Sequence, residues 1–366
     1  MTDYDNYISL KLAGDDAYLS EKMVGYPAEL DEVYAESFEE QKKEWFSCVG
    51  DGIQECRNTW EHKKWNITDF PEFELAITID RPELYYDFLQ KDWTRFCHDY
   101  WKNNFLEHHT LSQKRVTRIY IGNQFCHNLF PRKELLFQVL EKALENNLAV
   151  TLAFSYIRNH LLEEIDELLQ ELEVWCQSRE KEAGKDQEEI IVNDWAMPIL
   201  LQGKPHLKPV LGVLLNKRRK DVRLPYKQGI GNHVDSLAEN NLNCGFYQDY
   251  LKNTFDIQRF EFESCGYKVT IPDGHHSLHL PFFQTNTSQY CTLYAVCRYG
   301  DRGKQKLTEN CPRYCNKKVF LYPKHLKMVG RYNSLFGYDE KILWDEKQLQ
   351  DYLEQGIERI VVNVSL

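Results

Sequence analysis

From Phe73 onward, short β-branched apolar runs alternate with amphipathic helical segments, and this alternation constrains the fold more than any other feature. Strands that alternate with helices predict βα units and a mainly parallel sheet. About seven or eight such units favour an α/β fold with a (β/α) TIM-barrel-like domain, complete or distorted, over an open doubly wound sheet. The predicted strands cover residues 73–79, 118–122, 148–154, 188–194, 209–216, 255–263, 319–323 and 359–364.

Two segments fall outside this rhythm. Residues 1–70 are acidic and rich in aromatic side chains, and they predict a mainly helical N-terminal extension. Residues 71–366 form the predicted barrel domain, with an insertion at about 217–245 after the fifth strand. The insertion begins with the basic cluster KRRK (217–220), which either forms a solvated face or contacts a phosphate or carboxylate.

Charge and cysteine usage restrict the class of protein. A formal net charge of −11 disfavours a protein whose main task is to grip a phosphate backbone. The first residues lack a basic stretch followed by an apolar run, and no segment is apolar for long enough to span a bilayer. We therefore expect a cytoplasmic protein without membrane contact. In that reducing compartment, the 11 cysteines favour metal binding or catalysis over a disulfide framework.

Polar residues end several of the predicted strands. Asn193 and Asp194 end the fourth strand, Asn216 ends the fifth, and Glu261 and Glu263 end the sixth. Because parallel barrels carry their active sites at the carboxyl ends of the strands, all five are candidates for substrate binding or catalysis. The alternative for the three amide and aspartate positions is helix capping. Glu261 and Glu263 point to one face, where they act as paired carboxylates or form an ion pair with Arg259 or a lysine.

The three histidines of DGHHSLHL, His275, His276 and His279, suggest a metal site at first sight. They lie on a predicted loop and edge strand without a matching set of carboxylates. The pattern therefore indicates surface histidines.

The cysteines form a more specific pattern. Cys297, Cys311 and Cys315 come from one loop, and the last two have the spacing Cys-x3-Cys. Three soft sulfur ligands and a fourth partner suit either zinc or an iron–sulfur cluster. Zinc sites usually show two close pairs, so widely separated ligands favour the cluster. Cys126 follows the second predicted strand and is placed to meet a ligand at the barrel mouth.

Several motifs, taken in order, resemble those of the collagenase-like peptidase superfamily, family U32, and in particular its UbiV-type iron–sulfur branch. They are RIYIGNQFCHN, IIVNDW, VLGVLLN, YAVCRYGDRGKQKLTENCPRYC and VFLYPKHLKMVGRYNSL. The match runs from about Phe73 to Val364 and leaves out the acidic extension. Each motif is loose, but the set in this order is fairly specific.

The resemblance implies a barrel-like fold that binds a 4Fe-4S cluster through Cys126, Cys297, Cys311 and Cys315. The loop between Cys297 and Cys311 is one residue longer than the family pattern, and Arg298 follows the cysteine instead of preceding it. Cys291 lies near the position of the first cluster cysteine in another branch, so it is an alternative metal ligand in place of Cys126.

The resemblance further implies oxygen-independent hydroxylation or a related modification of an organic, peptide or nucleic-acid substrate. We therefore expect an iron–sulfur enzyme, or an enzyme subunit that works beside a paralogous partner protein. A noncatalytic iron–sulfur accessory subunit is the alternative, and peptidase activity ranks last because the usual peptidase motifs are absent. The acidic charge favours a small molecule or peptide as substrate, while the KRRK cluster keeps RNA among the candidates.

Overall fold

The computed structural model describes residues 70–183, 188–222, 238–301, 303–308, 310–321, 327–339 and 341–364. The predicted N-terminal extension lies outside these residues, as does most of the predicted insertion. None of the helices in this part of the chain is long and apolar enough to cross a membrane.

Eight parallel strands form a barrel-like sheet in the order β5-β4-β3-β2-β1-β12-β7-β6. The two outer strands meet through a single parallel bridge between Leu211 and Phe260, with Leu211 donating its N–H to Arg259 O over 3.0 Å. The barrel is thus nearly closed, as the alternation of strands and helices predicts. Its strands are β1 (Glu74–Ile79), β2 (Arg118–Gly122), β3 (Ala149–Ala153), β4 (Glu188–Val192), β5 (Leu207–Leu211), β6 (Glu261–Glu263), β7 (His276–Leu280) and β12 (Ile357–Val362).

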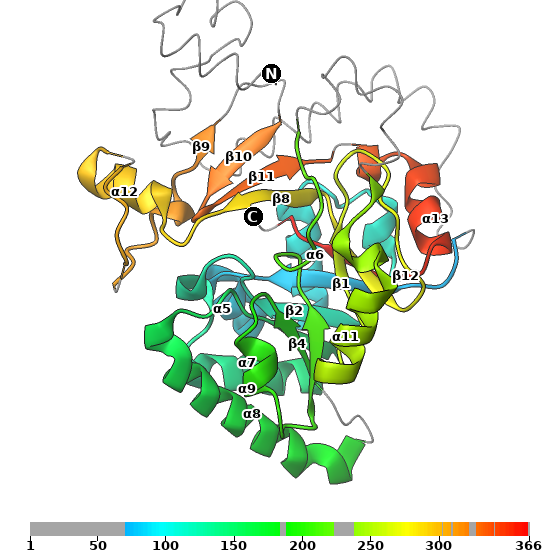
Figure 1. The fold of residues 1–366 in the computed structure, drawn as a ribbon, viewed down its shortest axis with the longest axis horizontal. Helices are drawn as coiled ribbons and strands as arrows, with labels where there is room; N and C mark the ends of the chain where they lie inside the picture. The colour runs from blue at the N-terminus through cyan, green and yellow to red at the C-terminus, as the bar shows by residue number, and fades with distance from the viewer. Residues whose placement is uncertain are drawn as a thin grey trace, which may run out of the picture.

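Helices cover the outside of this sheet (Figure 1). Local signals set their ends: Pro82 occupies the first turn of its helix, Asp92 caps the next by accepting the Arg95 N–H over 2.9 Å, and Asp256 ends a third in the left-handed conformation. The helices around the barrel are α5 (Pro82–Gln90), α6 (Trp93–Asn103), α7 (Lys133–Glu145), α8 (Leu162–Ala183), α9 (Met197–Leu200), α11 (Gly245–Phe255) and α13 (Glu346–Glu354).

A second sheet interrupts the barrel between β7 and β12. It is antiparallel, in the order β8-β11-β10-β9, and Figure 1 shows it above the barrel with α12 at its outer end. Its elements are β8 (Phe282–Thr287), α12 (Thr292–Tyr299), β9 (Phe320–Leu321), β10 (Met328–Arg331) and β11 (Ser334–Tyr338). The run at 319–323, predicted as a barrel strand, belongs to this sheet through β9, so that assignment is corrected.

Alternating side chains divide the core into two parts. One set of strand residues packs outward against the helices in a large apolar cluster. The opposite set fills the inside of the barrel, where a small apolar layer has polar side chains on both sides of it. That layer consists of Ala76, Tyr120, Ala153, Ile191, Val210 and Val361. Because only one side-chain layer of the interior is apolar, both ends of the barrel carry buried charge.

Two predicted strands have different bounds in the structure. The fifth ends at Leu211, where the next residue, Gly212, has no room for a side chain: a Cβ there would come within 2.2 Å of Asn193 Oδ1. The sixth begins only at Glu261, because residues 245–255 are helical.

Candidate functional site

The carboxyl ends of the barrel strands meet beneath β8, and most of the predicted polar residues lie there. Asn193 and Asp194 follow β4, Glu261 and Glu263 belong to β6, and Asn216 lies in the turn region after β5. A cavity of about 560 Å³ over this mouth is lined by Asn193, Asp194 and Asn216, together with residues of β8. This placement agrees with the rule that locates barrel active sites at the carboxyl ends of strands.

Asn193 and Asp194 hold loops in place. The buried Asn193 donates its Nδ2 to Phe154 O over 2.8 Å and accepts the Leu214 N–H over 3.1 Å. Asp194 Oδ1 accepts the N–H groups of Ala196 and Met197, each over 3.0 Å, at the start of α9. Asp194 thus binds the first N–H groups of α9, whereas Asn193 links the segments after β3 and β5 and caps no helix.

Asn216 differs from them because only one of the two polar atoms of its side-chain amide has a hydrogen-bond partner among the described residues. Its Nδ2 donates to Glu261 O over 3.1 Å, while its buried Oδ1 has no hydrogen-bond partner among the described residues. A buried polar atom without a partner is costly unless a ligand or water satisfies it. Because Asn216 lines the mouth cavity, a bound molecule there can supply that missing donor.

Glu261 lies inside the barrel with no exposed surface. Its carboxylate contacts His279 Nε2 at 2.5 Å and accepts the Tyr120 hydroxyl at 3.1 and 3.3 Å. Glu261 and Glu263 thus do point into the barrel, as their alternation along the strand predicts. The partner of Glu261 is a histidine from the neighbouring strand, which the sequence reasoning placed on the surface.

Glu263 pairs with a lysine, one of the two partners expected for these glutamates. Its Oε2 lies 2.5 Å from Lys220 Nζ, and its Oε1 accepts the Gln284 N–H over 2.7 Å. Lys220 also donates to Gln284 Oε1 over 3.0 Å. Desolvation lowers the pKa of Lys220, although the charge of Glu263 opposes that shift.

His276 and His279 correct the prediction of surface histidines, since both are buried in β7. Only His275 is exposed, where it contacts Glu358. The strand was missed because its inward residues, Ser277 and His279, are polar, which leaves Leu278 and Leu280 as its only apolar side chains. Its period of two was nevertheless visible in HSLHL.

The KRRK cluster follows the same rule of alternation. Lys217 and Arg219 are exposed, whereas Lys220 has 8% of its side chain exposed and faces Glu263. A solvated face therefore describes only half of this cluster. The sequence signal for Lys220 was its odd spacing from the exposed Lys217 and Arg219, which places it on the same side as Arg218, and its partner, on a distant strand, could not be inferred from that spacing.

The thiols form a second group beside the mouth. Cys126 begins the turn after β2, Cys315 lies in the short 3₁₀ helix η8 (Tyr314–Asn316), and Cys311 precedes η8. Desolvation raises the pKa of Cys126 to about 11, and the nearby Cys311 adds to the rise. Desolvation likewise raises the pKa of Cys315 to about 12, with contributions from Cys126 and Cys311. Three of the four predicted ligands therefore share one neighbourhood.

Cys291 is the fourth thiol of this neighbourhood. Desolvation raises the pKa of its thiol well above the ordinary value, and Cys126, Cys315 and Cys311 all add to that shift. Its Sγ caps α12 by accepting the Tyr294 N–H over 3.3 Å. We call Cys126, Cys291, Cys311 and Cys315 the thiol group.

Cys297 lies on a different side of α12. Cys291 is the extended residue before the first turn of α12, whereas Cys297 lies in its last turn, so the two thiols are at opposite ends of the helix. Desolvation raises the pKa of Cys297, and Lys318 is the neighbouring charge that opposes the rise. Cys291 was predicted as a possible replacement for Cys126. In the structure, Cys291 lies near Cys126, Cys311 and Cys315, whereas Cys297, which was expected in this group, does not.

The thiol group suits a soft, sulfur-bound metal group in its chemistry, because thiolates favour zinc and iron–sulfur clusters. All nine cysteines of the described residues are free thiols, so none of the four is taken up by a disulfide. Within the same residues, no three His, Cys, Asp or Glu side chains are already arranged as a metal site. The four sulfurs thus supply suitable donors that must move closer to bind such a group.

A cavity of about 630 Å³ adjoins the thiol group. Cys311, Arg313 and Thr308 line it from the cysteine loop, and His127 and Phe130 line it from the segment after Cys126. The Thr308 hydroxyl is buried and has no hydrogen-bond partner among the described residues. This cavity therefore offers room for a small molecule next to Cys311.

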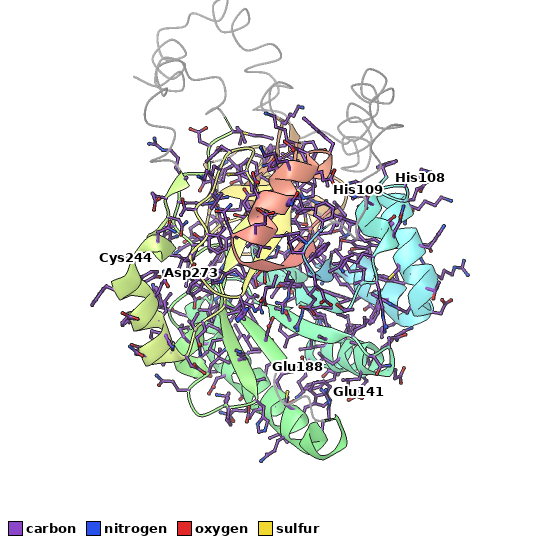
Figure 2. All side chains as sticks on the ribbon, turned by 90° about the vertical axis from the view of Figure 1, so that its right-hand side faces the viewer. His108, His109, Glu141, Glu188, Cys244 and Asp273 are labelled. Atoms are coloured by element: carbon purple, nitrogen blue, oxygen red, sulfur yellow. The ribbon has the colours of Figure 1, made fainter. Side chains whose placement is uncertain are left out.

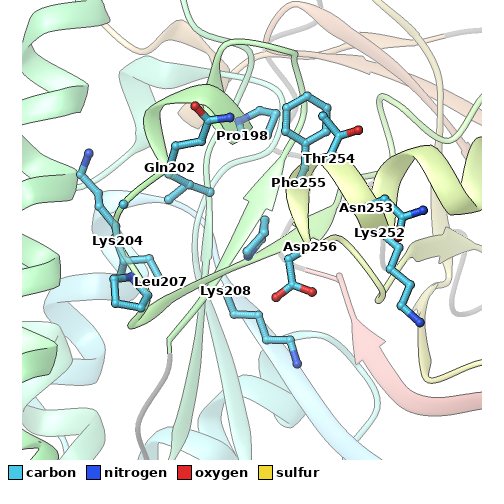
Figure 3. Close-up of a pocket in the computed structure, with 14 residues that line it drawn as sticks. Pro198, Gln202, Lys204, Leu207, Lys208, Lys252, Asn253, Thr254, Phe255 and Asp256 are labelled. Carbon is cyan, nitrogen blue, oxygen red and sulfur yellow. The ribbon is translucent and has the colours of Figure 1, made fainter.

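Other features lie away from both groups. Figure 3 shows a cavity of about 350 Å³ beside the start of β5, lined by Lys204, Lys208, Lys252 and Asp256, and none of the predicted site residues borders it. In Figure 2, Cys244 lies at the outer edge of the molecule beside α11. These positions contribute nothing to the mouth or to the thiol group.

Comparisons of the chain with protein-family models, curated proteins and solved structures found no match.

Proposed function

We propose that this protein binds a 4Fe-4S cluster and acts in the oxygen-independent hydroxylation, or a related modification, of an organic, peptide or nucleic-acid substrate. The observation that carries the proposal is the thiol group: four sulfurs from three separate segments gather beside the barrel mouth. The order of motifs that resembles the U32 family provides the second support.

Cys126, Cys291, Cys311 and Cys315 are the ligands in this proposal. Cys291 replaces Cys297 because its place at the start of α12 brings it toward the other three thiols. The positive end of the α12 dipole there favours a thiolate. A bound cluster would supply one-electron transfer or a Lewis-acidic iron.

The remaining chemistry belongs to the side chains of the mouth. His279 and Glu261 share a short hydrogen bond of 2.5 Å, and an imidazole oriented by a carboxylate is a common acid–base arrangement in active sites. The cavities beside Cys311 and over Asn216 have volumes that accommodate a small organic molecule. A substrate near these groups would be kept from bulk water by the second sheet.

Anaerobic purification followed by a visible spectrum and iron and sulfide analysis tests the proposal. We expect about four irons and four sulfides per chain, and a loss of at least about half of both in Cys291→Ser. Cys297→Ser is the matched control, because it changes a thiol of the same helix and should keep the full iron content. Colourless protein with stoichiometric zinc would contradict the cluster. If Cys297→Ser lost iron and Cys291→Ser kept it, Cys297 and not Cys291 would be the cluster ligand.

Hydroxylation is tested separately with candidate substrates in ¹⁸O-labelled water under anaerobic conditions. The expected product carries oxygen that does not come from dioxygen, and a strict requirement for dioxygen would contradict this part of the proposal. A paralogous partner is tested by asking whether a second related chain co-purifies with the intact protein. If this chain binds the cluster but substitutions at its own mouth leave the activity of the complex unchanged, the chain is a noncatalytic accessory subunit.

A further inference from the structure

The cavity over the barrel mouth has a positively charged wall. Lys217, Arg218 and Lys220 line one side of it, and Asp194 is the acidic side chain in its described lining. Since the Asp194 carboxylate is already held by backbone N–H groups, the cavity favours an anionic occupant. Its volume of about 560 Å³ suits a small organic anion with room for water.

Lys220 is an unusual lysine for such a wall because it is buried. Its amine is fixed by Glu263 at 2.5 Å and by Gln284 Oε1 at 3.0 Å, so it does not swing freely as surface lysines do. Buried lysines shift toward the neutral form, in which the amine is a nucleophile. Burial lowers the pKa of Lys220 in this way, even beside an acidic partner.

Glu263 is positioned to take the proton from that amine. One of its oxygens is already held by the Gln284 N–H at 2.7 Å, so the other is directed to Lys220. In a buried pair, passing the proton from the ammonium to the carboxylate leaves two neutral groups and removes the cost of burying charge. The pair therefore combines a nucleophile with its own base.

We propose that Lys220 is a reactive amine that captures a small 2-oxo acid as an imine in the cavity over the barrel mouth. The amine nitrogen attacks the carbonyl carbon after Glu263 accepts the ammonium proton. Glu263 then returns that proton to the carbonyl oxygen, and a second proton passes to the same oxygen from the amine nitrogen. The oxygen leaves as water when the C=N bond forms, and the imine nitrogen keeps its one remaining proton. No electrons are gained or lost in this step. The carboxylate of the ligand faces Lys217 and Arg218, and a hydroxyl or amine on it can donate to Asn216 Oδ1.

Reductive trapping of the intact protein tests this inference without any need for the metal. The protein is incubated with pyruvate and cyanoborohydride at pH 7, and carboxyethylated lysines are quantified by peptide mass spectrometry over time. We expect Lys220 to be modified at least about tenfold faster than Lys217, a difference of about 1.4 kcal/mol in activation free energy. Equal rates, or faster modification of the exposed Lys217, would overturn the inference, and this comparison needs no variant.

Two variants and one further probe separate the parts of the mechanism. Lys220→Arg keeps the charge and should abolish the fast modification, whereas Glu263→Gln keeps the shape and should slow it at least about fivefold. An unchanged rate in Glu263→Gln, with an unchanged melting temperature, would remove Glu263 from the step. Acetone, a ketone without a carboxylate, should be trapped more slowly than pyruvate; trapping at the same rate would refute a 2-oxo acid as the ligand class. Cluster loss would leave all of these rates unchanged, so this inference and the proposed function fail independently.

Discussion

The two ends of the barrel bury similar numbers of charges but pair them differently. At the amino end, Glu189 accepts two hydrogen bonds from Arg359, at 2.6 and 3.0 Å, and lies 3.4 Å from Arg118. Toward the mouth, Glu263 faces Lys220, and in the barrel interior Glu261, which is level with Arg359 on either side of Ser277, faces His279. Arginine keeps its proton under all ordinary conditions, whereas histidine and buried lysine can lose theirs.

The two sets of charges differ in the chemistry of their pairs, although Tyr120 links them by accepting from Arg359 over 3.1 Å and donating to Glu261 over 3.1 Å. Fixed charges at the amino end hold strands β1, β2, β4 and β12 together through Glu74, Arg118, Glu189 and Arg359. Burial raises the pKa of Glu189, but Arg118 and Arg359 outweigh burial and bring the pKa down to about 2. The other two carboxylates, Glu263 and Glu261, instead pair with Lys220 and His279. The same fold thus pairs carboxylates with arginine in one layer and with lysine or histidine in another.

Removing a fixed charge at the amino end should produce the largest effect. Arg359→Met removes the closest arginine from both Glu189 and Glu74, leaves Glu189 with the longer contacts to Arg118 at 3.4 Å and Arg259 at 3.6 Å, and should lower the free energy of unfolding by about 3–5 kcal/mol. Urea denaturation at pH 7 measures this change. The control is Glu358→Gln, whose side chain is 48% exposed and whose loss should cost at most about 0.5 kcal/mol. Equal losses in the two variants would remove the distinction between a buried network and surface charge.

Acid should weaken the amino end through Glu189. Its folded pKa of about 2 lies below the ordinary value of 4.5, so its contribution is complete above pH 4.5 and is lost as the pH falls toward 2. The full contribution is about 3 kcal/mol at 1.36 kcal/mol per pH unit. Urea unfolding between pH 6 and pH 2 follows the loss. In Glu189→Gln that part of the pH dependence should disappear, and an unchanged profile would show that other carboxylates control acid stability.

Removing a titratable cation at the mouth should have the smallest effect of the three. Lys220→Met leaves Glu263 buried without its cation, and Glu263 can take up a proton instead, which limits the cost to about 1–3 kcal/mol. Because the lone carboxyl is then favoured in its protonated folded form, the variant should lose stability as the pH rises from 5 to 8. Thermal melts across this range measure the trend. A loss as large as that of Arg359→Met, independent of pH, would mean that the two ends are built alike.

The sequence was sufficient to predict the positions of those barrel strands that are apolar. Strands β1, β2 and β3 lie within a residue or two of their predicted runs, because both of their neighbours and the covering helices demand apolar side chains. It failed at β7, whose inward side chains pair with groups on other strands. A histidine that is buried only because Glu261 lies beside it cannot be recognised before the two strands are brought together.

The candidate site divides in the same way. Strand-end logic predicted the neighbourhood of Glu261, Glu263 and Asn216, since it depends only on the direction of parallel strands. Their partners, Lys220 and His279, depend on a turn and on an adjacent strand that the pattern did not reveal. The sequence weighed Cys291 only as a replacement for Cys126, because the start of α12, which separates Cys291 from Cys297, could not be located from the pattern.

The second sheet also has a consequence for the order in which the protein is made. Strand β1 pairs with β12, so Glu74 cannot form its ion pair with Arg359 until β12 has been synthesised. The whole second sheet leaves the ribosome after β7 and before β12. Until then, the growing chain has an open edge on β1, of the kind that recruits foreign strands. Synthesis of this protein therefore carries a period of exposure to aggregation that ends only when residues 357–362 emerge, and chaperone dependence should be greatest in that interval.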